Sequence, residues 1–559
     1  NIWSALSSQP ADVYGAGRSL VPILGEMGRY ALAVLPTPRR GAPRVQVFTT
    51  TNEVVLNTDD MTFPHFRTGQ AAPMALGIPV LNMTSRHLSA VQAQVLENEH
   101  FESTTVTFDG LTGGAVTQVT FELRPKAAFP EPETPIPFTV RIESPQLSQA
   151  YDVALTWNTI AADQPFRQTF VSPVDGSTQY YGVRPPTAEP EAEEMALVLS
   201  LHGAGVEGIG QARAYSAKDW AYIIAPTNRR PFGFDWEEWG RLNALSALDD
   251  ATARFPIDPT RVYLTGHSMG GHGTWHVGVS TPGRFATLGP SAGWESFYSY
   301  GGTERPTGPI GRARAHSDTL VYLSNITQRG IYVIHGTADD NVPLREGRTM
   351  FAAASMHTDD IEMHEEPGAG HWWDGDAAGG ADCVDWPPLF DFMNERRLDP
   401  YEVNFDFLSA SPSYNPDHSF VHLESAITPL EDVRVRSQQR GDAVKLTTEN
   451  VRSLLVDTDV LAAQGITALR WDGAQHDTGQ GLVHLGPDTG KQSGAYGPYN
   501  QVFRRPFCYV YPDDAAGYQR SAAHFVSYWA LYGNGQACGL PLSALTPEIA
   551  ARNQLVRMG

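Results

Sequence analysis

The most regular feature of the chain is a series of short, uninterrupted apolar runs in its central part. Stretches with helical spacing, such as residues 239–249, separate them. Apolar runs of this length indicate strands that are buried on both faces, and their alternation with helices is typical of a mostly parallel sheet covered by helices. We therefore expect an α/β domain over residues 166–398. The runs are Ala196–Leu201, Ala221–Ala225, Val262–Thr265 and Ile331–Ile334.

The two flanks of this segment alternate apolar and polar residues instead. Residues 117–123 and 151–157 have the two-residue period of half-buried strands, with Pro- and Gly-rich turns between such stretches. They predict an N-terminal β-rich, immunoglobulin-like accessory domain over residues 1–165. Residues 431–437 and 443–448 indicate a hairpin, and 518–529 a helix. Residues 399–559 are therefore expected to form a C-terminal β-rich (α+β) accessory domain.

Composition narrows the class of protein. A chain of 559 residues is too long for one core, so several domains are expected. The formal net charge of −22 disfavours nucleic acid and anionic membranes as partners. No apolar run approaches the roughly 18 residues of a membrane-spanning helix. We expect no membrane insertion.

The cysteines and the first residues bear on the compartment. Cys508 and Cys538 could form one disulfide if the protein is exported, and Cys383 would then be free; three buried thiols fit the sequence equally well. The chain begins at Asn1 with neither a start Met nor a signal peptide, which fits a mature or trimmed N-terminus. We expect a secreted or periplasmic protein.

The candidate chemistry begins with the sequence Gly-His-Ser-Met-Gly-Gly at residues 266–271. It follows a β-branched apolar run and precedes a helix-like run. A Gly-x-Ser-x-Gly turn in that context is a nucleophile elbow, which exposes the serine hydroxyl above the strand ends. Ser268 is the candidate nucleophile.

Two further strand ends supply possible partners for a nucleophilic serine. Asp339 and Asp340 follow the run at 331–334, and either carboxylate could orient a histidine. His371 lies in a glycine-rich loop further on. His364 lies inside an expected strand, and His335 belongs to a strand end where a structural role is favoured. The order Ser, Asp, His favours His371 as the base.

The sequence also offers an oxyanion hole. Residues 202–205 form a His-Gly-Ala-Gly turn directly after the strand at 196–201. The backbone N–H of Ala204, together with the N–H of Met269 behind the serine, could stabilise a developing negative charge.

Tryptophans cluster after the expected strand ends. We expect some of them to line a pocket for an acyl or aromatic group, and at least half to pack in the core. The candidates for the pocket are Trp236, Trp239, Trp294 and Trp372.

His272 and His276 lie four residues apart on the helix that follows the serine. That spacing can bind zinc, but no glutamate follows His272 and no third ligand is evident. We expect a buried histidine pair with no metal, and no organic cofactor is needed either.

Together these motifs resemble the α/β-hydrolase superfamily, and within it the prolyl oligopeptidase-like and dienelactone hydrolase-like esterase branch. The similarity rests on Arg261–Gly271 and His335–Pro343, and the Ser-Met-Gly-Gly start of the helix is also similar to feruloyl esterases and polyhydroxyalkanoate depolymerases. The resemblance implies Ser268 as nucleophile, Asp339 as orienting acid and His371 as base. Residues 1–165 show no repeat of the length of a β-propeller blade. The sequence therefore favours an esterase over a peptidase of prolyl oligopeptidase type.

The leading hypothesis is a serine carboxylic ester hydrolase that works through an acyl-enzyme. Its partner would be a small-molecule or polymeric ester of short-chain, aryl, feruloyl or polyester type. A serine peptidase of prolyl oligopeptidase type is the first alternative, and a non-catalytic binding protein on a hydrolase scaffold is the second. The sequence leaves the oligomeric state open.

Overall fold

The computed structural model describes residues 22, 49–187, 195–476, 478–487, 489, 491, 495–496 and 499–559. Residues 1–21 and 23–48 of the expected N-terminal domain lie outside this part of the chain. None of the helices within it is long and apolar enough to cross a lipid bilayer.

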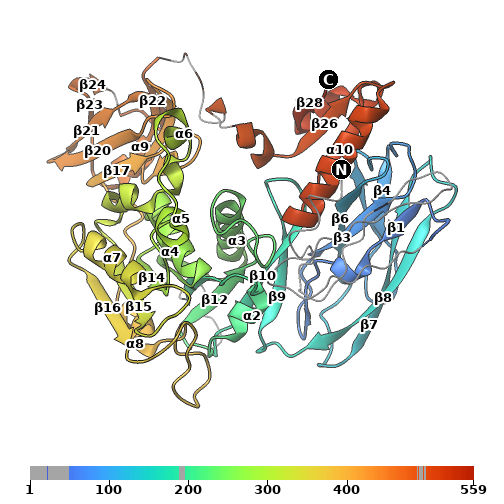
Figure 1. Cartoon of the computed structure of the whole chain (residues 1–559), viewed down its shortest axis with the longest axis horizontal. Coiled ribbons are helices and arrows are strands. Elements are labelled where there is room, and N and C mark those ends of the chain that lie inside the picture. The colour runs from blue at the N-terminus through green and yellow to red at the C-terminus, as the bar shows by residue number, and fades with distance from the viewer. Residues whose placement is uncertain are drawn as a thin grey trace.

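An eight-stranded sheet forms the centre of the molecule (Figure 1). Six neighbouring strands are parallel, and β10 and β9 continue the sheet in antiparallel fashion. This arrangement confirms the mostly parallel sheet that the apolar runs predict. In spatial order the strands are β16 (Ile361–Glu366), β15 (Gly330–Gly336), β14 (Thr287–Ser291), β13 (Ile257–His267), β11 (Met195–Leu201), β12 (Ala221–Pro226), β10 (Thr178–Arg184) and β9 (Phe166–Val171).

Helices cover both faces of this sheet. Alternate residues of β11 point to opposite sides, so that Leu197 and Leu199 belong to one apolar cluster and Ala196 and Val198 to another. The first cluster includes side chains of α3 (Trp239–Arg254), α4 (Met269–Ser280) and α7 (Leu344–Ala354), and the second those of α8 (Pro387–Asn394). Each fully buried Leu or Val contributes about 1.5–3 kcal/mol of transfer free energy. Shorter helices are α2 (Gly208–Arg213), α5 (Phe297–Gly301) and α6 (Gly308–Ala313).

Two sheets built from residues 54–160 enclose a separate apolar cluster with Phe66, Phe101 and Phe138 at its centre. The three-stranded sheet has the order β1 (Val54–Leu56), β3 (Met74–Asn82), β6 (Val116–Leu123). The five-stranded sheet has the order β2 (Phe66–Arg67), β8 (Tyr151–Ile160), β7 (Pro135–Glu143), β4 (Val91–Val95), β5 (Thr104–Phe108).

Residues 405–485 form a second pair of sheets, orange in Figure 1, around their own apolar cluster. The expected hairpin is present, because β20 pairs with β21 in antiparallel register. One sheet has the order β17 (Phe405–Ser409), β20 (Val433–Arg440), β21 (Ala443–Glu449), β23 (Ala468–Trp471), β24 (Ala474–His476). The other has the order β18 (Asp417–His418), β19 (Val421–Ala426), β22 (Val451–Asp457), β25 (Leu482–Leu485), and helix α9 (Thr458–Ala463) follows β22.

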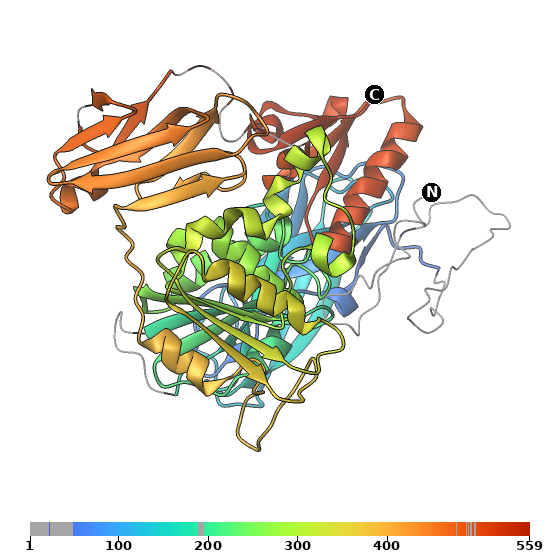
Figure 2. The ribbon, with the colours of Figure 1, turned by 60° about the vertical axis from the view of Figure 1, so that its left-hand side comes forward.

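The last part of the chain packs elsewhere. Its sheet and helix α10, red in Figures 1 and 2, lie beside the blue N-terminal strands and apart from the orange sheets. The Thr112 hydroxyl donates to the Gly539 carbonyl (2.8 Å) and accepts from the Gly539 N–H (2.7 Å). The elements are β26 (Phe507–Tyr511), α10 (Ala516–Gly533), β27 (Cys538–Pro541), α11 (Pro547–Arg552) and β28 (Gln554–Arg557).

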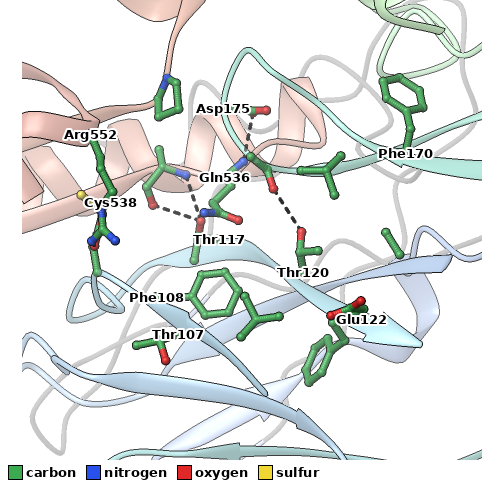
Figure 3. A pocket seen from close by; sticks show the side chains of 18 of the residues that line it. Thr107, Phe108, Thr117, Thr120, Glu122, Phe170, Asp175, Gln536, Cys538 and Arg552 are labelled. Carbon is green, nitrogen blue, oxygen red and sulfur yellow. Dashed lines mark hydrogen bonds and ion pairs between the residues drawn. The ribbon is translucent and has the colours of Figure 1, made fainter. Parts of the chain in front are cut away.

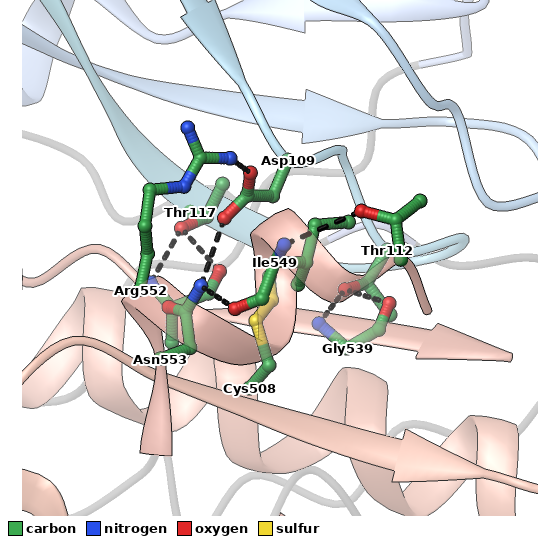
Figure 4. Close-up of a disulfide and its surroundings, with 11 residues drawn as sticks. Asp109, Thr112, Thr117, Cys508, Gly539, Ile549, Arg552 and Asn553 are labelled. Carbon is green, nitrogen blue, oxygen red and sulfur yellow. Dashed lines mark hydrogen bonds and ion pairs between the residues drawn. A yellow bond between two sulfur atoms is a disulfide. The ribbon is translucent and has the colours of Figure 1, made fainter. Parts of the chain in front are cut away.

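A disulfide joins Cys508 to Cys538 in this C-terminal sheet, while Cys383 is free and buried (Figure 4). Beside it, Asp109 accepts hydrogen bonds from Arg552 and from Asn553 (3.0 Å) and so joins the tail to the N-terminal sheets. Residues 399–559 are thus divided between two places in the structure. The division of the chain into three domains remains a prediction.

Buried ion pairs fix the long loop between β12 and α3 to both flanks. Arg230 donates two hydrogen bonds to Asp60 (2.8 and 3.0 Å), and both side chains are buried. Arg229 pairs with Asp175 and donates to the Gly533 carbonyl at the end of α10 (2.6 Å). Bidentate Arg–carboxylate pairs hold a fixed geometry, so this loop has a defined position next to the central sheet.

Candidate active site

Ser268 occupies a sharp turn between β13 and α4. Its backbone is left-handed (φ 61°, ψ −118°), a conformation that non-glycine residues rarely adopt. Glycines make the turn possible: a Cβ on Gly266 would lie 2.4 Å from the Gly270 oxygen, and a Cβ on Gly270 would lie 1.8 Å from the Leu201 oxygen. Only glycine fits this close backbone approach, which is the geometry that the motif predicts.

The structure brings three of the predicted side chains into one hydrogen-bonded chain. His371, in the loop after β16, has its Nε2 atom 2.8 Å from the Ser268 Oγ atom. Its Nδ1 atom lies 2.8 Å from Oδ2 of Asp339, in the loop after β15. Parallel strands end at one edge of the sheet, so loops after β13, β15 and β16 meet there although they are far apart in sequence.

Asp339 is held as a carboxylate. Its side chain is fully buried, and burial by itself raises the pKa of a carboxyl group. Hydrogen bonds from His335 and His371 and from the backbone N–H groups of Asn341 and Val342 (2.9 Å each) outweigh that effect. The net pKa of Asp339 is therefore well below its ordinary value.

The other candidates for the acid and the base lie away from Ser268. Asp340, the neighbour of Asp339, is exposed. His364 is on β16, where it bonds Glu366 (2.8 Å) and stacks on Trp386. His335 is buried behind Asp339, with its Nε2 atom 2.9 Å from the Val342 carbonyl oxygen. None of these three contacts Ser268.

The two expected oxyanion donors flank Ser268. Ala204 lines the same cavity, and a Cβ on its neighbour Gly203 would lie 4.0 Å from the Ser268 Oγ atom. Met269 is the first residue of α4, a position whose N–H has no acceptor within its own helix. Both N–H groups belong to backbone directly next to the serine.

A cavity of about 570 Å³ opens over Ser268 and His371. Of the described residues that line it, Arg213 at the end of α2 is the one Arg or Lys, and none is Asp or Glu. Arg213 is exposed and has no hydrogen-bond or ion-pair partner within the described part of the chain. Arg213 is therefore the one residue with a permanent positive charge among the described residues that line the cavity.

The four tryptophans separate into two groups. Trp372 lines the cavity and is half exposed. Trp236 is fully buried and donates to the His202 carbonyl (3.0 Å), and Trp294 is buried. Trp239 packs on Trp529 of α10. None of these last three lines this cavity: Trp236 and Trp294 are buried and Trp239 is partly buried, since a tryptophan after a strand end can pack inward as readily as outward.

The sequence reasoning missed His267, which also lines the cavity. Its ring lies against His371 (4.8 Å between centroids) and edge-on to Trp372 (5.3 Å). Burial, together with the charge of His371, lowers its pKa to about 3, so the ring is neutral near pH 7. A neutral ring adds no charge next to His371. Its position immediately before the serine in the motif is the signal that could have revealed it.

His272 and His276 are buried on α4, and the structure adds Glu237 from the loop between β12 and α3. One potential ligand atom of each lies within 4.8 Å of the others. A third potential ligand, which the sequence does not reveal, therefore lies beside the histidine pair.

A second cavity, of about 580 Å³, lies between the N-terminal sheets, β9 and the C-terminal sheet (Figure 3). Several charged groups along it are already paired, such as Asp250 with Arg254 (3.0 Å) and Asp109 with Arg552. It contains none of the residues of the Ser268 chain, so we place the candidate active site at the other cavity.

Comparison with known families gives a match for the central part of the chain. Residues 233–382 match the family model described as "Prolyl oligopeptidase family", and this range includes Ser268, Asp339 and His371. The match confirms the resemblance to the prolyl oligopeptidase-like branch of the α/β-hydrolases.

Individual relatives are distant. An "Uncharacterized secreted protein" of Arthroderma benhamiae is 24% identical over 366 residues, which are 59% of this chain and 38% of that protein. S-formylglutathione hydrolase of Rattus norvegicus is 36% identical over 62 residues, 11% of this chain and 19% of that protein. The chain thus spans less than two fifths of the length of these curated relatives. Among solved structures, a thermostable esterase is 16% identical with a TM-score of 0.31, over 60% of this chain and 97% of its own.

Proposed function

We propose that the protein is a serine hydrolase that cleaves carboxylic esters through an acyl-enzyme. The observation that carries this proposal is the chain of two 2.8 Å contacts from Ser268 through His371 to the buried Asp339, with Ser268 and His371 lining a cavity. A serine hydroxyl becomes nucleophilic when a histidine in this position accepts its proton.

In the first half of the reaction, His371 Nε2 removes the Ser268 proton while the serine oxygen attacks the ester carbonyl carbon. Asp339 accepts the hydrogen bond from Nδ1–H and stabilises the imidazolium. The carbonyl oxygen becomes an oxyanion, which the N–H groups of Ala204 and Met269 bind. Losing one such donor costs about 2.7–4 kcal/mol. The oxyanion collapses, the bond to the alcohol oxygen breaks, and His371 protonates the departing alcohol.

The second half repeats these steps with water. His371 removes a proton from a water molecule, whose oxygen attacks the acyl carbon of the acyl-enzyme. Collapse of the second oxyanion releases the carboxylic acid, and His371 returns the proton to Ser268. The free enzyme is restored without a metal or an organic cofactor taking part in any step.

The candidate substrates are esters of short-chain, aryl, feruloyl or polyester type. Trp372, half exposed at the cavity, offers a flat surface for an aromatic or extended acyl group. A peptidase of prolyl oligopeptidase type is the second candidate, and the family match to residues 233–382 favours it. A binding protein without activity is the third, and the complete hydrogen-bonded chain at Ser268 argues against it.

We also propose that the protein acts outside the cytoplasm, with the sheets on either side of the central one as accessory domains. The name of the Arthroderma benhamiae relative and the disulfide Cys508–Cys538 support export, because disulfides persist in oxidising compartments.

The test compares the wild type with Ser268→Ala on a panel of p-nitrophenyl, feruloyl and polyester substrates and an X-Pro peptide. The proposal expects turnover of at least one ester class by the wild type and its loss in Ser268→Ala. Efficient peptide cleavage with poor ester turnover would contradict the esterase proposal and favour the peptidase instead. A wild type that neither turns over any ester or peptide nor reacts with a fluorophosphonate would leave only the binding function.

A further inference from the structure

A compact cluster of metal-ligating side chains lies on α4, away from the hydrogen-bonded chain at Ser268. His272 and His276 are one helical turn apart and buried (0% and 1% exposed). Glu237 reaches them from the loop between β12 and α3, and its side chain is 15% exposed. The three potential ligand atoms all lie within 4.8 Å of one another.

The hydrogen bonds of His272 are unusual. Its Nδ1 atom lies 3.2 Å from the Trp294 carbonyl oxygen, and its Nε2 atom lies 3.3 Å from a Glu237 carboxylate oxygen. Both of these partners are acceptors, whereas a neutral imidazole carries one N–H. If Nδ1–H donates to the carbonyl, then a lone pair on Nε2 faces a carboxylate. A cation between these two atoms would satisfy both.

The surroundings of His276 and Glu237 also favour a bound cation. The Nε2 atom of His276 lies 2.5 Å from the Tyr414 hydroxyl oxygen, so Nδ1 is the ring nitrogen left for a metal. This Nδ1 atom has no hydrogen-bond partner among the described residues, although its ring is almost fully buried, and a bound ion can satisfy such an atom. The second oxygen of Glu237 accepts a hydrogen bond from the Ser317 hydroxyl (2.6 Å), which holds the carboxylate in place.

We propose that Glu237, His272 and His276 bind one zinc ion, or a divalent transition metal of the same preference. In a tetrahedral site with bonds of 2.0–2.1 Å, neighbouring ligand atoms are about 3.3 Å apart, and the distance from His272 Nε2 to Glu237 is 3.3 Å. Two imidazoles with one carboxylate select zinc over magnesium or calcium. The contact of His272 Nδ1 with a backbone carbonyl is the common support of a metal-bound histidine.

The metal would hold the loop that carries Trp236 and Glu237 against α4, the helix that directly follows Ser268. Its role is to stabilise this arrangement, because the proposed ester cleavage needs no metal. The acidic cluster Asp374, Asp376 and Asp382, of which the first two are exposed, is a weaker candidate, since exposed acidic groups are common without an ion.

The test uses full-length protein without a histidine tag. The protein is stripped with a chelator and titrated with zinc and cobalt, and bound metal is counted by mass spectrometry after dialysis. We expect one retained equivalent of zinc, the visible absorption bands of four-coordinate cobalt, and a higher Tm with metal. Glu237→Gln keeps the size of the side chain and should weaken the affinity by about tenfold or more. Asp376→Asn, in the acidic cluster, is the matched control and should bind like the wild type.

Three results would overturn the proposal. The first is a wild type that retains no metal at micromolar free zinc. The second is equal zinc affinity in wild type and Glu237→Gln, and the third is loss of the retained zinc in Asp376→Asn. The wild-type stoichiometry and the cobalt spectrum depend on no variant, so they decide the question even if Glu237→Gln does not fold.

Discussion

Replacing Asp339 with asparagine should reverse the proton arrangement of His371. One carboxylate oxygen, Oδ1, accepts the N–H groups of Asn341 and Val342 (2.9 Å each), and the other, Oδ2, faces His371. In Asp339→Asn the amide oxygen must therefore occupy the Oδ1 position, because an NH2 group cannot accept those N–H groups. The NH2 group then points at Nδ1 of His371. Nδ1 becomes an acceptor, Nε2 carries the proton, and the histidine can no longer take the proton of Ser268.

The size of the effect follows from this change of tautomer. In the serine protease triad, which uses the same geometry, the equivalent change lowers kcat by about 10⁴-fold. A factor of this size corresponds to about 5.4 kcal/mol in activation free energy. We predict a loss of about 10⁴-fold in kcat for Asp339→Asn with little change in KM, because the carboxylate does not line the cavity.

The assay is steady-state hydrolysis of the best ester, with Tm and circular dichroism as controls for folding. Asp340→Asn is the matched control. Asp340 is the exposed neighbour with no contact to His371, and its substitution should change kcat by less than about twofold. If folded Asp339→Asn keeps more than about a tenth of the wild-type kcat, then the assignment of Asp339 is wrong.

Three further predictions concern the turn, the cavity and pH. Gly270→Ala should prevent soluble folding or lower the Tm strongly, since its Cβ would lie 1.8 Å from the Leu201 oxygen. Gly370→Ala is the control and should be tolerated, because no atom lies within 4 Å of its Cβ. Thermal melts of both variants test this prediction. Arg213→Met should raise KM about tenfold for esters with an anionic acyl group and leave matched neutral esters unchanged. An equal effect on both would contradict a role of the Arg213 charge in binding the acyl group. Burial lowers the pKa of His267 from 6.5 to about 3, so its contribution to stability is complete above pH 6.5 and is lost as the pH falls towards 3. Urea titrations give the decrease in unfolding free energy from about pH 7 to about pH 5, and this decrease should be about 2 kcal/mol smaller in His267→Gln than in the wild type. The same pH dependence in both proteins would contradict the lowered pKa.

The sequence predicts the central sheet and the geometry at Ser268 because both depend on local signals. Continuous apolar runs identify several of the strands, and Ser268 and Asp339 follow the ends of two of them. His371 follows β16, whose residues alternate apolar and polar side chains at its start. Parallel strands then bring these ends together without any information about contacts between distant residues. The glycines at 266 and 270 are readable for the same reason, since the close approach of the turn excludes any side chain.

Other features depend on contacts that no local pattern encodes. Glu237 lies in an irregular loop 35 residues before His272, and its direction is set by backbone that is left-handed at Trp236 and Glu238. The C-terminal sheet docks on the N-terminal sheets through contacts such as Thr112 to Gly539, which are 427 residues apart. Hydrophobic periodicity identifies strands such as residues 117–123 in the N-terminal segment, but it indicates only the helix at 518–529 in the C-terminal one and cannot show that the two segments meet.

Ser268 is the nucleophile on which the proposed chemistry depends, and mass-spectrometric mapping of a fluorophosphonate adduct tests this assignment without the need for a known substrate. We predict one adduct per chain, located on Ser268, absent in Ser268→Ala and formed much more slowly in Asp339→Asn. An adduct on another residue, or ester turnover that persists at the wild-type rate in Ser268→Ala, would contradict the assignment.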